Sequence, residues 1–185
     1  MQQINIYEEA EDFIKKGSMS SVSYDSTQAP FFHKDKYKKG EIGFDTSKVN
    51  KIFETLPLPD KLKRIYLVLG RVDNEFYYGD WTLLSLNKVQ SLYRKYCNNN
   101  QARAIDFAMI YAGMGHVVVC SYDFVTGKVY YRHSGGANGY EQDDMYKFSL
   151  KYIPKNSELY DIEHWFDIIE QKETDAFSLP LVKEY

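Results

Sequence analysis

The segment 105–133 constrains the fold more than any other part of the chain. Two turn signals, Gly113-Met114-Gly115 and Val125-Thr126-Gly127, divide it into three runs that are rich in β-branched and aromatic residues. Such runs are typical of strands, and short connections between them favour antiparallel neighbours. We therefore predict a three-stranded antiparallel meander at the centre of the domain, with strands over 104–111, 116–124 and 128–133.

Helical periodicity marks the chain on both sides of this meander. Asp45-Thr46-Ser47, Asp60 and Ser85 are each suited to begin a helix, and apolar residues then recur three or four positions apart. The predicted helices cover 47–56, 60–69, 85–96 and 160–171. Two further strands are predicted over 75–84 and 146–153. The stretch 17–43 has no sustained period, so we expect a loop or extended chain there, packed against the domain.

The length of 185 residues suits one domain with an extension. We expect an N-terminal extension over 1–46, made of a short helix and an irregular segment, a domain over 47–175 and a C-terminal tail over 176–185. The predicted fold class is α/β of the α+β type: a single domain with a mostly antiparallel twisted sheet, the meander at its centre and helices packed around it.

Composition places the chain in the cytoplasm. No apolar run approaches the roughly 20 residues needed to cross a bilayer. The N-terminus is acidic, whereas a signal peptide would be basic and then apolar. Cys97 and Cys120 lack CxxC or zinc spacing, so we expect reduced thiols. A disulfide between them would need an oxidising compartment. We expect no membrane association.

The charge is unevenly distributed along the chain. Residues 1–105 carry 16 basic and 13 acidic side chains, a balance of +3, whereas residues 106–185 carry 7 and 13, a balance of −6. A difference of this kind can steer a basic protein toward the C-terminal half, although surface solvation explains it equally well. It argues against a nucleic-acid partner, because nucleic-acid binders usually present a basic domain.

Catalytic candidates are few. On the meander, His116 and His133 lie on neighbouring strands, and Asp106 and Asp123 could serve beside them in an enzyme with an unrecognised site. A structural or surface role suits these residues as well, and Asp123 is typical of a turn residue whose side chain binds nearby amides. His116 and Cys120 share a strand face about 13 Å apart, too far for a common metal or nucleophile pair. His33 and His164 fall in no motif. We expect no metal and no cofactor.

The loop after the meander, 134–145, is rich in glycine and then acidic. Its glycines are only superficially similar to a phosphate-binding loop, because the Lys-Ser/Thr pair is absent and acidic residues follow. An acidic contact surface is the better interpretation. The predicted partner-binding residues are Tyr140, Glu141, Asp143 and Asp144.

Several signals occur in a particular order between residues 47 and 171. A Leu-Pro precedes a helix, a Trp strand leads into Leu-Leu-Ser-Leu, the meander carries GMG and DFVTG, and a final helix carries Trp-Phe. In this order the chain resembles the SUKH superfamily, which joins Smi/Knr-type fungal cell-wall regulators with bacterial toxin-immunity proteins and has members in large DNA viruses. The residues that carry the motif are Pro59, Trp81, Gly115, Asp123, Gly127 and Trp165.

The resemblance implies a protein-binding domain without catalysis. An immunity protein of this family would neutralise a toxin by occluding its active site, and the acidic half would suit a basic toxin; a regulator would recruit a client protein instead. Two alternatives stay open: a structural or assembly protein, for example of a large DNA virus, and the enzyme described above. The oligomeric state is not predicted.

Overall fold

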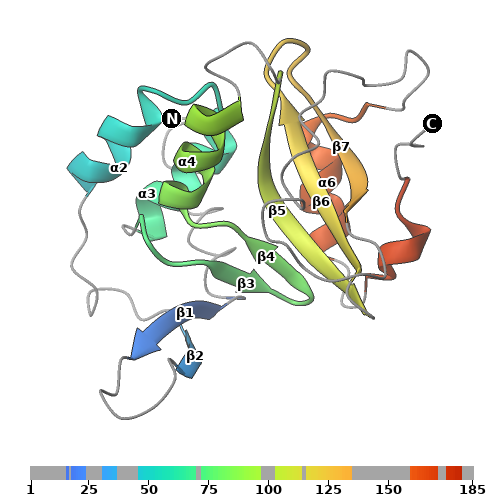
Figure 1. Cartoon of the computed structure of the whole chain (residues 1–185), viewed down its shortest axis with the longest axis horizontal. Helices are drawn as coiled ribbons and strands as arrows, with labels where there is room; N and C mark the ends of the chain where they lie inside the picture. Colours follow the sequence, from blue (N-terminus) through green and yellow to red (C-terminus); the bar gives the residue numbers. More distant parts are fainter. Residues whose placement is uncertain are drawn as a thin grey trace, which may run out of the picture.

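The computed structural model describes residues 16, 18–23, 31–36, 46–69, 72–96, 103–113, 116–134, 159–170 and 174–180. The predicted meander is present, but it lies at one end of the sheet and not at its centre, because the other described strands continue the sheet from one side of it. The strands of the meander are antiparallel neighbours, as predicted, and Figure 1 shows them side by side. The register sets Ala104 opposite Asp123 and Asp123 opposite Lys128, with a bulge between Asp106 and Ala108. The strands are β5 (Ala104–Gly113), β6 (His116–Asp123) and β7 (Lys128–Ser134).

The strand predicted over 75–84 is in fact a hairpin of β3 (Phe76–Tyr78) and β4 (Trp81–Leu83). The prediction of one strand was wrong because Gly79 and Asp80 form a two-residue connection. Gly79 has a φ of +56°, which glycine adopts without the clash that a Cβ would cause. β4 pairs with β5, with Trp81 opposite Ile110. The hairpin therefore extends the meander to a five-stranded antiparallel sheet.

A second hairpin continues this sheet beyond β3. Its strands are β1 (Ser18–Ser23) and β2 (Phe31–Lys36), and β1 pairs with β3 at Met19 and Phe76. The sheet order is β2-β1-β3-β4-β5-β6-β7. The segment 17–43, expected as loop or extended chain, is thus extended over these strands. Residues from the expected extension share a sheet with the domain.

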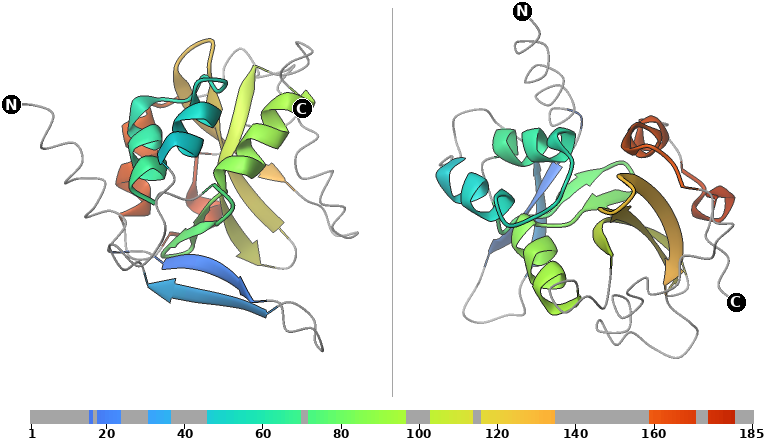
Figure 2. Two further views of the ribbon diagram at one scale, coloured as in Figure 1. Left: turned by 90° about the vertical axis from the view of Figure 1, so that its left-hand side faces the viewer. Right: turned by 90° about the horizontal axis from the view of Figure 1, so that it is seen from above.

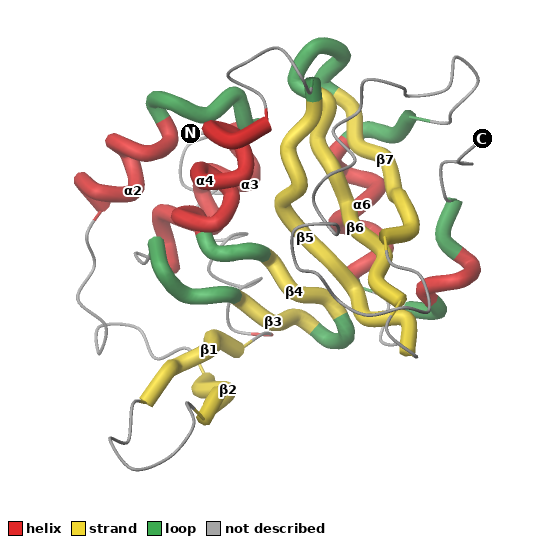
Figure 3. Tube along the Cα trace, in the orientation of Figure 1, coloured by secondary structure: helices red, strands yellow, loops and turns green. Residues whose placement is uncertain are grey.

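Four α-helices accompany the sheet in the described part of the chain: α2 (Thr46–Phe53), α3 (Asp60–Leu69), α4 (Leu86–Tyr96) and α6 (Ile162–Ile169). The left view of Figure 2 shows α2, α3 and α4 side by side on one side of the molecule, and Figure 3 shows α6 behind the meander. Three of them fall within predicted segments, and α2 begins one residue before the predicted segment 47–56. Ser85 begins α4, because its Oγ accepts a hydrogen bond from the Lys88 amide at 3.2 Å.

Aromatic side chains join the sheet to α6. The rings of Trp81 and Trp165 meet edge to face at 6.1 Å, and Phe107 meets Trp165 at 5.0 Å. All three are buried. The expected tail, 176–185, contributes to the same core, because Ala176 in the short helix η1 (Ala176–Ser178) and Leu179 are also buried. This architecture confirms the predicted single-domain α+β class. None of the helices described is long and apolar enough to span a bilayer.

Candidate functional site

The residues predicted to bind a partner lie outside the described part of the chain: Tyr140, Glu141, Asp143 and Asp144. So do the predicted strand 146–153, Cys97 and the motif residue Gly115. The other five motif residues have structural positions. The carbonyl of Pro59 accepts a hydrogen bond from the Lys63 amide at the start of α3. Trp81 and Trp165 contact each other in the core. Asp123 and Gly127 shape the turn after β6. The motif residues that can be placed therefore support the scaffold.

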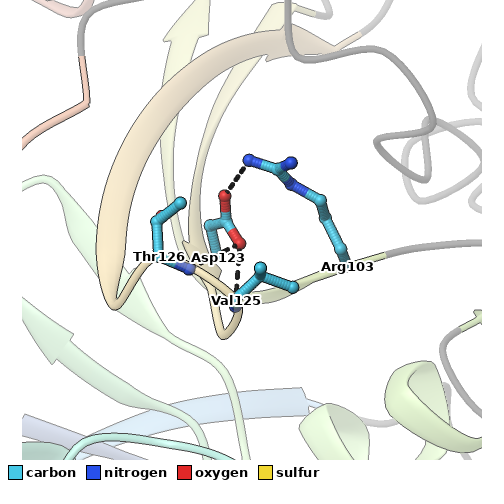
Figure 4. Close-up of polar contacts among 4 residues, drawn as sticks. All are labelled: Arg103, Asp123, Val125 and Thr126. Atoms are coloured by element: carbon cyan, nitrogen blue, oxygen red, sulfur yellow. Dashed lines mark hydrogen bonds and ion pairs between the residues drawn. The ribbon is translucent and has the colours of Figure 1, made fainter.

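Asp123 organises the turn between β6 and β7 (Figure 4). Its carboxylate is fully buried, and Oδ1 accepts the amides of Val125 at 2.9 Å and Thr126 at 3.3 Å. Oδ2 accepts Nη2 of Arg103 at 2.5 Å. Gly127 completes the turn with a φ of +72°, and its amide donates to the Asp123 carbonyl. This confirms the prediction that Asp123 is a turn residue, and its carboxylate is occupied by internal donors.

Asp106 has a similar internal role in the middle of the meander. Its two carboxylate oxygens accept the Ser121 hydroxyl and the Arg132 guanidinium, each at 2.5 Å. The side chains of Asp106 and Arg132 are almost entirely buried. Tyr130 packs in the same group, and burial raises the pKa of its phenol well above the usual value, with the Asp106 charge adding to the shift. Asp106 thus holds β5, β6 and β7 together across the sheet.

Register places the two histidines of the meander. His133 pairs with Val118 on β6, while His116 pairs with Gly113 on β5. His164 on α6 lies with Nδ1 3.0 Å from the Tyr131 hydroxyl, and its ring stacks on Tyr160 at 4.0 Å. Burial raises the pKa of the Tyr131 phenol, which therefore stays protonated in this hydrogen bond. The pair anchors α6 to β7.

The described part of α6 and its flanks is acidic. Residues 159–170 contain Asp161, Glu163, Asp167 and Glu170 and no lysine or arginine. Three of these acids form ion pairs at the surface: Asp161 with Lys128, Glu163 with Lys61, and Glu170 with Lys16. Each of the three acids keeps more than half of its side chain exposed. Asp167 is exposed as well. The helices α2, α3 and α4 are basic by contrast: together they contain eight basic residues and a single acid, Asp60.

A small apolar surface lies where the end of α4 meets the β6–β7 turn. The rings of Tyr93 and Phe124 contact each other edge to face at 6.1 Å, and Val125 beside them is 66% exposed. Arg94 is exposed and follows Tyr93 on α4, and Arg103 before β5 binds the turn through its carbonyl and its side chain. We name these five residues the turn patch. Val125 was predicted as part of a turn, and its β-branched apolar side chain at the turn tip is the sequence signal for such a surface.

Residues suited to hold a metal do not cluster in the regions that can be described, where no group of three His, Cys, Asp or Glu side chains converges. Cys120 is a free, buried thiol, and burial raises its pKa. Comparisons with protein-family models, with curated proteins and with solved structures give no match. The class of the protein is therefore defined by its fold, a single-domain α+β protein with an antiparallel sheet.

Proposed function

We propose that this chain is a non-enzymatic protein-binding domain of the SUKH type, an immunity protein or a regulatory adaptor, whose partner docks on an acidic surface. The observation that carries the proposal is the acidic outer side of α6, formed by Asp161, Glu163, Asp167 and Glu170. Exposed ion pairs contribute little energy, typically about 0–1 kcal/mol, so a basic partner can displace the lysines that contact these acids.

The polar groups inside the sheet favour a binding role over catalysis. Asp106 and Asp123, the carboxylates that an enzyme at this site would need, are each held by internal donors. Using either as an acid or base would disrupt the sheet or the turn. The scaffold role of the motif residues also agrees with a family whose members share a fold and differ in their surfaces.

Electrostatic steering provides the mechanism. The acids on α6 belong to the segment 106–185, whose net charge is negative. The same segment contains the loop with Glu141, Asp143 and Asp144. A basic protein would be attracted to this half and oriented by the basic helices α2, α3 and α4, which repel it. The partner would be captured rapidly at low salt and more slowly at high salt.

The test compares capture of native-cell proteins by the purified chain and by charge variants. Asp167→Lys with Glu170→Lys, and separately the triple reversal of Glu141, Asp143 and Asp144, should reduce recovery of the partner, more at low salt than at high salt. A matched control is Glu54→Lys with Asp73→Lys, the same charge change at exposed positions outside the acidic segment 106–185. Equal recovery with all variants would contradict the proposal.

A further inference from the structure

The turn patch combines an exposed apolar side chain with fixed positive charge. Val125 at 66% exposure and Tyr111 at 62% are the large hydrophobic side chains that stand out as exposed in the described regions. Tyr111 is near the opposite end of β5 from Arg103. Tyr93 and Phe124 are half-buried beside Val125, so the apolar surface extends beyond a single side chain. Such a surface can be covered by an apolar group of another molecule.

The turn that presents Val125 is rigidly held. Asp123 binds the amides of Val125 and Thr126, and the amide of Phe124 donates to the Arg103 carbonyl at 3.2 Å. The side chain of Arg103 closes the arrangement by its ion pair with Asp123 (Figure 4). A partner that docks here meets a preformed surface and loses less entropy on binding than it would on a loose loop.

The charge around the turn patch is positive. Arg94 and Lys95 are exposed on α4, and Arg103 is 41% exposed. The acid that Arg103 contacts, Asp123, is completely buried. Arg94 has no partner among the residues that the structure describes. The patch therefore complements a negatively charged ligand, in contrast to the acidic surface of α6.

We propose that the turn patch is a docking site for an acidic protein segment that carries an apolar side chain, with the apolar group on Val125 and Phe124 and the acids on Arg94 and Arg103. Apolar and aromatic side chains bordered by arginine are typical of protein–protein contact centres. A single-stranded nucleic acid is disfavoured because it needs open ring faces for stacking, and the Tyr93 and Phe124 rings are turned against each other. This site is independent of the acidic surface proposed above.

The test titrates the isotope-labelled full chain with a short synthetic peptide rich in Asp and Glu that carries one Phe and one Leu. Backbone amide signals of residues 93–95, 103 and 123–127 should shift. Val125→Asp should weaken binding about fivefold or more, the loss expected at the centre of a contact. Arg94→Glu, at an exposed helix position that does not endanger folding, should weaken it severalfold at low salt and less at high salt.

Two matched controls separate the patch from general charge effects. Tyr111→Asp places the same charge on another exposed hydrophobic residue, and Lys51→Glu makes the same reversal on α2; both should bind like the original chain. The proposal is overturned if the patch signals do not shift, if the controls weaken binding equally, or if a peptide with Lys in place of the acids binds as well. It is also overturned if a single-stranded oligonucleotide shifts these signals and Val125→Asp leaves that binding unchanged.

Discussion

Replacing Asp123 by alanine should destabilise the protein strongly, because one buried carboxylate makes three contacts. Its Oδ1 accepts two turn amides and its Oδ2 accepts Arg103. A hydrogen bond to a charged group contributes about 1.5–3 kcal/mol, and the longer contact with Thr126 contributes less. Arg103 is 41% exposed, so its ion pair adds only about 1 kcal/mol. The expected loss is about 3 kcal/mol in the free energy of unfolding.

Asparagine at the same position separates these contributions. Asp123→Asn keeps an oxygen for the turn amides and loses the charge that faces Arg103. We expect a loss of about 1 kcal/mol, in line with an exposed ion pair. In a double-mutant cycle with Arg103→Met, the coupling energy should also be about 1 kcal/mol.

Urea unfolding followed by circular dichroism measures both variants, with melting temperature as a second readout. At this chain length 1 kcal/mol corresponds to about 2–4 °C, so Asp123→Ala should melt roughly 6–12 °C lower than the original chain. If the alanine and asparagine variants are equally stable, the turn amides contribute nothing. A loss below about 1 kcal/mol for alanine would refute the reasoning about the carboxylate as a whole.

Three further predictions follow from the core and its turns. Burial raises the pKa of Tyr66, Tyr130 and Tyr131, so their phenols ionise more easily in the unfolded chain than in the folded one. The free energy of unfolding should therefore be unaffected below about pH 10 and fall as pH rises above it. Ultraviolet absorbance should show these phenolates appearing only with unfolding. Gly79→Ala should cost about 1 kcal/mol because φ is +56°, whereas Gly79→Asn should cost less, since asparagine tolerates this conformation; equal urea midpoints would count against the strain argument. Trp165→Ala should cost about 3–5 kcal/mol through loss of its buried ring contacts, and a calorimetric loss under 1 kcal/mol would show that the packing around it is not needed.

Local signals predicted the elements where one residue type has one strong conformational preference. Asp123 and Gly127 were recognisable as turn residues, and the hydrogen bonds and positive φ confirm them. Ser85 was recognisable as the start of α4. The β3–β4 hairpin was missed although Gly79-Asp80 between aromatic residues is a hairpin signal, because the aromatic run was interpreted as continuous.

The candidate sites could be predicted less well than the elements. His116 and His133 lie on neighbouring strands, as predicted, and register pairs His133 with Val118, two residues along β6 from His116. A shift of one residue changes which face every side chain occupies, so the positions of these side chains depend on the exact register. Arg103 and Tyr93 entered no prediction of a site, because their contacts with the β6–β7 turn come from segments far away in the sequence.

The sequence by itself determined the meander, the helical faces and the uneven charge, since turn residues and apolar periodicity act over a few neighbouring positions. The tertiary structure alone decided what those parts do together. It placed Arg103 on Asp123, Arg132 on Asp106 and His164 on Tyr131, and it gathered Tyr93, Phe124 and Val125 into one surface. These contacts depend on strand order and packing across distant segments, so they exist only once the chain has folded.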